Sequence, residues 1–270
     1  PWRMPFLNMR NHRKLLVVDG SLAFLGGINI GKENCAHLAG ERQIKDVHFR
    51  VTGPAACIVM DAFARDWTFT TEENLDQDCW WPKLQARGNS FARGLRSGPD
   101  ADIYKIEMLL GAAINLAQKR IRIVTPYFLP DARLQFALQQ AGLRGVLVEI
   151  VIPACSDQRL MDWAMRGHLR FFRHVRADII ATPPPFDHTK LCTVDEEWSL
   201  IGSSNWDARS FRLNFEFDLE IIDRDFTAKL DGLIDARIAA GGRLTPDMLA
   251  AEPLWMRLRN AAARLLLPYL

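Results

Sequence analysis

The stretch NHRKLLVVDG at residues 11–20 recurs in outline as DHTKLCTVDE at residues 187–196. Each copy holds a histidine, a lysine two residues later and an aspartate five residues after the lysine. Two small residues and an asparagine then follow in both copies. Every matching pair is separated by 176 residues, which indicates an internal duplication: His12, Lys14, Asp19, Gly26, Gly27 and Asn29 in the first copy, and His188, Lys190, Asp195, Gly202, Ser203 and Asn205 in the second.

Each copy of the motif predicts a β-hairpin. The apolar run Leu15–Val18 is followed by a turn and a second run, Ser21–Leu25, and the runs Leu191–Val194 and Trp198–Ile201 repeat this pattern. Alternate side chains of a strand lie on the same face, so a histidine and a lysine two residues apart project together. The motif therefore brings an imidazole and an ammonium group to one side of each hairpin.

The rest of the chain alternates between predicted helices and strands. This alternation predicts an α/β sandwich with a largely parallel sheet. The expected helices cover residues 55–68, 103–117, 132–142, 158–172 and 226–239, and the expected strands cover 46–51, 121–125, 146–152, 177–181 and 216–222.

These elements divide the chain into four parts. We expect a partial first half over residues 1–72, a linker over 73–100, a second half over 101–240 and a carboxyl-terminal helical segment over 241–270. A long α/β segment precedes the second motif, whereas only 11 residues precede the first. The first half is therefore expected to be incomplete, and the chain to be a piece of a longer protein.

Composition narrows the classes of function. The chain of 270 residues is 49% hydrophobic and 24% charged, as in ordinary globular proteins, and its net charge of +2 argues against binding nucleic acid by bulk electrostatics. Its five cysteines contain no C-x-x-C pair, which predicts reduced thiols and neither a zinc site nor a disulfide framework. The sequence has no apolar run of about 18 residues that would span a bilayer.

The carboxyl-terminal stretch at residues 253–267 is amphipathic. Its apolar residues alternate with three arginines, Arg257, Arg259 and Arg264. Two interpretations fit this pattern: a helix packed on the domain, or an interfacial helix whose arginines suit anionic lipid headgroups.

The duplicated side chains suit transfer at a phosphodiester. One imidazole can attack phosphorus and form a phosphohistidine, while the other protonates the leaving oxygen and later deprotonates the incoming alcohol or water. Lysine and asparagine side chains can surround the non-bridging oxygens, where negative charge accumulates. We therefore expect neither a cofactor nor a metal ion.

A carboxylate is expected to orient each imidazole. An acceptor on the second ring nitrogen fixes the histidine tautomer. Asp46 and Glu216 occupy matching places after the two hairpins, once a loop six residues longer in the first half is allowed for.

The doubled motif resembles that of the phospholipase D superfamily. Several stretches are more narrowly similar to the bacterial cardiolipin synthases of that superfamily: residues 11–20, TPYF at 125–128, PPFDHTK at 184–190 and GSSNWDARSFRLNFE at 202–216. The resemblance runs from about Asn11 to the end of the chain. It implies a duplicated phospholipase D-type α/β/α sandwich, in which two pseudo-twofold-related halves share one active site.

The resemblance also implies an activity and a set of site residues. It implies a phosphatidyltransferase that makes cardiolipin from two phosphatidylglycerol molecules and releases glycerol, with His12 as the nucleophile and His188 as the acid. Phosphatidylglycerol, other anionic phospholipids and the surface of the bacterial inner (cytoplasmic) membrane are the implied partners, and a preceding segment is expected to anchor the protein. The implied catalytic residues are His12, Lys14, Asp19, His188, Lys190 and Asp195, and the implied phosphate-binding residues are Asn29 and Asn205.

Two alternatives stay open at this point. One is a phospholipase D-type phosphodiesterase that hydrolyses phospholipid or nucleic acid, although the near-neutral charge and the lack of a basic, aromatic-rich patch argue against nucleic acid. The other is a degenerate scaffold that binds anionic lipid without turnover. Both motifs are complete, which argues against the scaffold.

Overall fold

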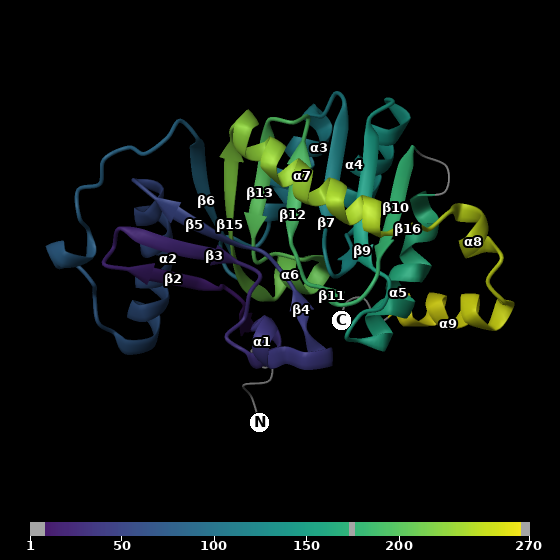
Figure 1. Ribbon diagram of the computed structural model, residues 1–270, viewed down its shortest axis with the longest axis horizontal. Coiled ribbons are helices and arrows are strands. Elements are labelled where there is room, and N and C mark those ends of the chain that lie inside the picture. The colour runs from purple at the N-terminus through teal and green to yellow at the C-terminus, as the bar shows by residue number, and fades with distance from the viewer. Residues whose placement is uncertain (1–8, 173–175, 266–270) are drawn as a thin grey trace.

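The second half of the chain is organised around one mixed β-sheet in the computed structural model, which describes residues 9–172 and 176–265 (Figure 1). Parallel pairing joins β9 to β7 and to β10, whereas β12, β13 and β15 form an antiparallel meander next to β7. The expectation of a largely parallel sheet is therefore wrong, because the hairpin of the second motif inserts two antiparallel strands. The described strands of this sheet run in the order β1 (Arg10–Asn11), β15 (Asn214–Ile222), β13 (Trp198–Gly202), β12 (Leu191–Val194), β7 (Arg120–Val124), β9 (Leu147–Pro153), β10 (Ala177–Thr182) and β16 (Gly242–Arg243), and β6 (Phe91–Ser97) also pairs with β15.

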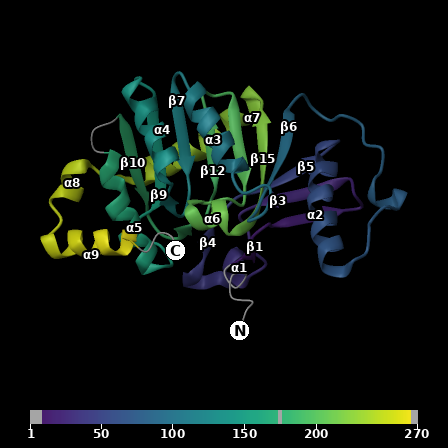
Figure 2. The same cartoon turned by 180° about the vertical axis from the view of Figure 1, so that it is seen from behind.

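Helices cover both faces of this sheet. The helix α7 (Arg224–Ala240) lies in front of it in Figure 1, and α3 (Lys105–Leu116), α4 (Ala132–Leu143) and α5 (Arg159–Leu169) cover the other face, as Figure 2 shows from behind. Two apolar clusters fill the layers, one under α3, α4 and α5 and one under α7 and the first half. Burial from both sides explains why the sequence of β9 is almost entirely apolar. The layers form the expected α/β/α sandwich.

The first half repeats part of this architecture. Three antiparallel strands, β2 (Leu15–Val18), β3 (Leu22–Gly26) and β5 (His48–Thr52), form a separate sheet, and α2 (Ala55–Thr71) follows β5 as α7 follows β15. The hairpin β2–β3 corresponds to β12–β13, so both predicted hairpins are confirmed.

Two short parallel pairings join the halves. The first is between β1 and β15, where Asn11 pairs with Phe215, and the second is between β11 (Phe186–Asp187) and β4 (Ile44–Lys45). The pairing continues at the histidines, because the His12 amide donates to the Phe215 carbonyl at 2.9 Å and the His188 amide donates to the Lys45 carbonyl at 2.7 Å. Each histidine is thus placed beside the residue that precedes the other half's carboxylate.

Residues 91–97 of the expected linker form β6, seven residues paired with β15. The irregular connection is therefore shorter than the predicted linker over 73–100. The carboxyl-terminal segment begins with β16 before its helices α8 (Pro246–Ala250) and α9 (Leu254–Leu265). The smaller elements are η2 (Lys32–Asn34), α1 (Ala36–Ala39), η3 (Gly40–Arg42), η4 (Asp78–Trp80), β8 (Phe128–Leu129), η5 (Arg170–Phe172), β14 (Trp206–Asp207) and α6 (Ala208–Arg212).

Candidate active site

Each motif histidine is bound by the carboxylate of the opposite half. His12 Nδ1 lies 2.9 Å from both carboxylate oxygens of Glu216, and His188 Nδ1 lies 2.8 Å from Asp46 Oδ2. Each histidine meets the opposite half's carboxylate because the two parallel strand pairings bring the start of each motif beside that carboxylate. With Nδ1 held by a carboxylate, Nε2 of each ring is the nitrogen left for chemistry.

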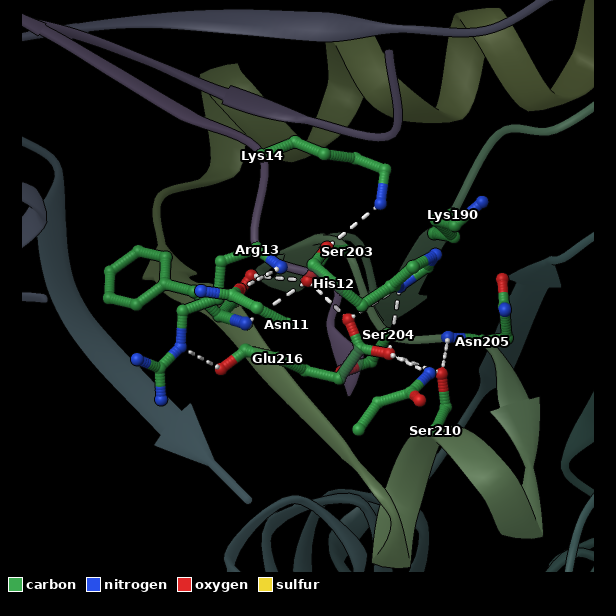
Figure 3. Close-up of polar contacts among 12 residues, drawn as sticks. Asn11, His12, Arg13, Lys14, Lys190, Ser203, Ser204, Asn205, Ser210 and Glu216 are labelled. Carbon is green, nitrogen blue, oxygen red and sulfur yellow. Dashed lines mark hydrogen bonds and ion pairs between the residues drawn. The ribbon is translucent and has the colours of Figure 1, made fainter. Parts of the chain in front are cut away.

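Glu216 is fully buried and held by several donors. The hydroxyls of Ser203 and Ser210 donate to it at 2.5 and 2.6 Å, and Asn214 Nδ2 donates at 3.1 Å. Burial opposes ionisation of Glu216, but the hydrogen bonds from His12, Ser203 and Ser210 outweigh it and hold the pKa of this carboxyl below its usual value. The carboxylate is therefore ionised and fixed in place before any substrate arrives (Figure 3).

The counterpart Asp46 lies against a glycine. A Cβ on Gly27 would fall 2.4 Å from Asp46 Oδ2, so only glycine allows this approach. Gly27 matches Ser203 in the repeat. Ser203 therefore gives its half's carboxylate, Glu216, a hydrogen-bond donor, whereas Gly27 gives Asp46 room to approach the backbone. Burial and the Lys190 charge lower the pKa of His188, despite the hydrogen bond to Asp46, so the free imidazole is neutral at pH 7.

The two motif lysines are brought to the same place. Lys14 Nζ donates to the His12 carbonyl at 2.8 Å, and Lys190 Nζ donates to the His188 carbonyl at 2.5 Å. The charges of Asp46 and Glu216 act on both ammonium groups, which shows that the halves form one electrostatic unit. Burial lowers the pKa of Lys14, and it lowers the pKa of Lys190 to about 7. Two desolvated cations with lowered pKa values favour an anionic ligand between them.

Anion binding is therefore expected to weaken as the pH rises. Because the pKa of Lys190 is about 7 in the free site, a bound anion must be accompanied by proton uptake above that pH. We expect the affinity for sulfate, whose own charge is constant over this range, to fall by about tenfold per pH unit above pH 7. Calorimetric titration at several pH values checks this. Lys190→Met should bind sulfate weakly with a flatter pH dependence, and an unchanged dependence in that variant would contradict the assignment.

A cavity of about 320 Å³ opens beside His12. Asn205, Asp207 and Arg209 line it from the segment that follows the second hairpin, and Tyr127 lines it from the segment after β7. Burial raises the pKa of Asp207 to about 6, and its carboxylate accepts the Ser210 amide at the start of α6. The cavity therefore offers both cationic and hydrogen-bonding groups next to the imidazole.

The expected asparagines have different positions. Asn205 lines the cavity, and its Oδ1 is buried with no hydrogen-bond partner among the described residues, so no contact fixes which amide atom faces a ligand. Asn29 is exposed on the loop after β3, and the cavity beside His12 is lined by other residues. This loop is the longer one, and it contains η2, α1 and η3 before it returns at β4. The structure thus places Asn205, but not Asn29, in the cavity beside His12.

The motif aspartates lie at the hairpin turns, not at the histidines. Asp19 and Asp195 adopt left-handed backbone conformations with φ of 50° and 53°. Asp195 accepts the backbone amides of Gln118, Lys119 and Arg120 at 2.7 to 2.8 Å. Burial opposes its ionisation, but these bonds outweigh it and hold the pKa of Asp195 below its usual value. Six residues lie between His188 and Asp195, and an extended chain of that length spans roughly 20 Å, so the aspartate anchors the hairpin turn far from the imidazole.

Sequence reasoning did not identify Ser210, Asn214 and Asp207 as site residues. All three lie within the stretch 202–216 that carries the resemblance. The spacing of Asp207 and Ser210 is that of a helix N-cap and its third residue, which would have predicted the start of α6 but not the contact of Ser210 with Glu216.

The second half of the chain is similar to a known protein family. Residues 110–238 match the family described as "Cardiolipin synthase, PLD-like domain". The chain is 34% identical over 266 residues to a cardiolipin synthase of Listeria welshimeri and 36% identical over 269 residues to cardiolipin synthase A of Pseudomonas putida. Both matches cover 98% of this chain and 55% of the relative, so the chain spans about half the length of these curated relatives.

Solved structures share the fold. Phosphatidylserine synthase of Haemophilus influenzae superposes with a TM-score of 0.72 at 16% identity, over 96% of this chain and 71% of that one. Nuc of Salmonella typhimurium, a phospholipase D family member, matches with a TM-score of 0.50 at 20% identity, over 58% of this chain and 99% of its own. These likenesses confirm the fold class expected from the sequence.

Proposed function

We propose that this chain, whose residues 110–238 match a cardiolipin synthase, PLD-like domain, forms the active site of a phosphatidyltransferase of that family. The proposed reaction makes cardiolipin from two phosphatidylglycerol molecules. One observation carries the proposal: two histidines, each held at Nδ1 by the other half's carboxylate, share one site with the partly buried Lys14 and the buried Lys190.

The geometry supports a two-step displacement. In the first step His12 Nε2 attacks the phosphorus of one phosphatidylglycerol, the bond to the glycerol oxygen breaks, and His188 donates the proton that glycerol carries away. In the second step His188 removes the proton from a glycerol hydroxyl of another phosphatidylglycerol, whose oxygen attacks phosphorus and displaces His12. The anionic phosphodiester favours the protonated state that His188 needs in the first step. Lys14 and Lys190 offset the charge on the non-bridging oxygens.

Lipid analysis tests this function. We expect the full-length protein, supplied with phosphatidylglycerol in detergent, to form cardiolipin and free glycerol in equal amounts. Mass spectrometry of the lipid products measures both. Phosphatidic acid as the main product would show that water is the acceptor, and cleavage of DNA without any lipid product would contradict the proposal.

Catalysis is expected to need no divalent metal ion. The side chains of Lys14, Lys190 and Asn205 supply cationic charge and a hydrogen-bond donor around the phosphate. Cardiolipin formation in mixed detergent micelles should therefore stay within about threefold of its rate when a chelator is added. Complete loss of the chemistry, restored by one specific metal ion, would count against this prediction.

The carboxyl-terminal helix α9 supports both interpretations of its amphipathic sequence. It packs on α5 through its buried residues Asn260 and Ala263, close to Gly167, where a Cβ would lie 2.7 Å from the Asn260 carbonyl. Leu254, Leu258 and Leu265 share the opposite face and are 62 to 75% exposed. No acidic residue occurs in the helix, and Arg257 and Arg264 border the leucines.

We propose that this leucine face contacts an anionic lipid surface and that the protein acts at the bacterial cytoplasmic membrane. Among the described residues, no helix is both long and apolar enough to cross a membrane. Anchoring through a preceding segment stays a prediction.

Vesicle binding tests the leucine face. Leu254→Glu together with Leu258→Glu should weaken binding of the chain to phosphatidylglycerol vesicles by about tenfold or more, since both apolar area and charge complementarity are lost. Sedimentation with the vesicles measures the change. Leu143→Glu is the control, because this leucine is 67% exposed at the end of α4, and an equal loss there would contradict a role specific to α9.

A further inference from the structure

In each half, one residue of a helix binds both sequence neighbours of the motif histidine. In the first half this residue is Asp66 of α2. Its carboxylate accepts Asn11 Nδ2 at 3.0 Å and Arg13 Nη1 at 2.5 Å. Asn11 and Arg13 flank His12 directly in the sequence, and Figure 3 labels all three residues. We call Asp66 with its two partners the first clamp.

In the second half the corresponding residue is Arg237 of α7. Its Nε donates to Asp187 Oδ2 and its Nη2 to Thr189 Oγ1, both at 2.8 Å. Asp187 and Thr189 flank His188 as Asn11 and Arg13 flank His12. The side chains of Arg237 and Asp187 are only 4 and 3% exposed, so this ion pair is desolvated. We call Arg237 with its two partners the second clamp.

A local turn spans the histidine in both clamps. The Arg13 amide donates to Asn11 Oδ1 at 3.0 Å, and the Thr189 amide donates to Asp187 Oδ1 at 3.1 Å. The remaining polar atom of each first residue, Asn11 Nδ2 or Asp187 Oδ2, is the one that the helix residue binds. The backbone on both sides of each imidazole is thereby fixed to a helix of its own half.

The helix residues of the two clamps, Asp66 and Arg237, have opposite charge and do not occupy matching positions in their helices. Asp66 is the twelfth residue of α2, whereas Arg237 is the fourteenth of α7. Asp66 of α2 accepts hydrogen bonds from the first motif, whereas Arg237 of α7 donates hydrogen bonds to the second. The same geometric result from different residues indicates that what is maintained is the orientation of the histidine.

The first clamp also reaches the opposite half. Arg13 Nε donates to the Glu216 carbonyl at 3.2 Å, and its guanidinium lies 5.6 Å from the centre of the Phe215 ring. Asp66 therefore holds Arg13 against β15, the strand that carries the carboxylate partner of His12.

We propose that Asp66 and Arg237 are positioning residues, the first for His12 and the second for His188. The inference rests on the proposed function. Neither side chain binds an imidazole, and each fixes the two neighbours that set the direction of the ring. A displacement of about 1 Å at a reacting group can lower a rate by about 10²-fold, so loss of a clamp should be visible in kinetics.

Two single-turnover measurements on the full-length protein separate the histidines. In the first, excess protein reacts with phosphatidyl-p-nitrophenol, whose leaving group needs no acid, so the rate of nitrophenolate release reports attack by His12. In the second, the resulting adduct is mixed with phosphatidylglycerol, and the rate of cardiolipin appearance reports deprotonation of the acceptor by His188.

Asp66→Asn should slow nitrophenolate release by about 10- to 100-fold and affect the second rate at least about fivefold less. Arg237→Lys, which cannot bridge Asp187 and Thr189, should show the reverse pattern. Thr189→Val removes one bond of the second clamp but leaves the buried Arg237–Asp187 pair intact. It should show the Arg237→Lys pattern in weaker form even if Arg237→Lys does not fold.

Two matched variants provide the controls. Asp61→Asn removes ion pairs with Arg65 and Arg96 from α2, and Arg224→Gln removes a surface pair with Glu197 from α7. Both should leave the two rates within about twofold of the wild-type values.

The outcomes are distinguishable. If the wild-type protein releases nitrophenolate but each clamp variant slows both steps equally, or lowers only the fraction of active protein, the clamps are merely structural and this inference is wrong. If the wild-type protein forms no adduct, the proposed function itself is wrong.

Discussion

Replacing His12 by alanine is expected to lower the rate of cardiolipin formation by about 10⁴-fold or more, because the proposed nucleophile is removed. His188→Ala should cost a similar factor with phosphatidylglycerol, since the glycerol oxygen then leaves unprotonated and the acceptor keeps its proton. The kcat values of the purified full-length variants measure both effects.

The control for this prediction is His37→Ala. His37 is an exposed residue of α1, and the rate of that variant should stay within about twofold of the wild-type rate. A double variant, His12→Ala with His188→Ala, that retained the wild-type rate would show that the site has been assigned to the wrong residues.

The second large effect concerns the crossed carboxylates. Glu216→Gln should lower kcat by about 10³- to 10⁴-fold, because an amide that donates to Nδ1 stabilises the wrong tautomer of His12. Asp46→Asn should have a comparable effect through His188, to which Asp46 Oδ2 is bound at 2.8 Å. In both cases KM should change far less than kcat, because both carboxylate side chains are buried behind the imidazoles that they bind.

Kinetics can show which carboxylate acts on which histidine. The rate of nitrophenolate release from phosphatidyl-p-nitrophenol should fall in Glu216→Gln and change little in Asp46→Asn, although Asp46 belongs to the same half as His12. Glu220→Gln on the same strand is the control, since Glu220 binds Arg93 and Trp198 and not a histidine. Loss of nitrophenolate release in Asp46→Asn but not in Glu216→Gln would mean that each carboxylate acts within its own half.

Much of the site could be predicted from the repeat. A fixed offset of 176 residues identified both histidines and both lysines, and the alternation of strand side chains explained why they project together. The same comparison singled out Asp46 and Glu216 as the two carboxylates. These predictions depend on local spacing, which a sequence shows directly.

The partners of those carboxylates could not be predicted. Which histidine each one binds depends on the pairing of β1 with β15 and of β11 with β4, which are two-residue contacts between distant segments. Strand β6 was missed for a related reason. Its sequence, FARGLRS, has no clear apolar alternation, and its pairing with β15 determines its structure.

The position of Asn29 shows the limit of arguing from repeats. Asn29 and Asn205 match in register, but the longer loop of the first half leads Asn29 to the surface. The aspartates Asp19 and Asp195 match in register too, and both lie at a hairpin turn in a left-handed backbone conformation. Equivalence in a repeat therefore indicates equivalent local structure, and the long-range pairings decide which residues reach the phosphate.

The most direct test of the shared site is to locate the covalent intermediate. In His188→Ala, phosphatidyl-p-nitrophenol should still react, because nitrophenolate leaves without an acid, and the adduct should then persist because no base activates the acceptor. Quenching, proteolysis and mass spectrometry should find about one phosphatidyl group per chain, on His12, and none in the variant that also carries His12→Ala. A stable adduct on another residue, or rapid nitrophenolate release without any adduct, would contradict this account.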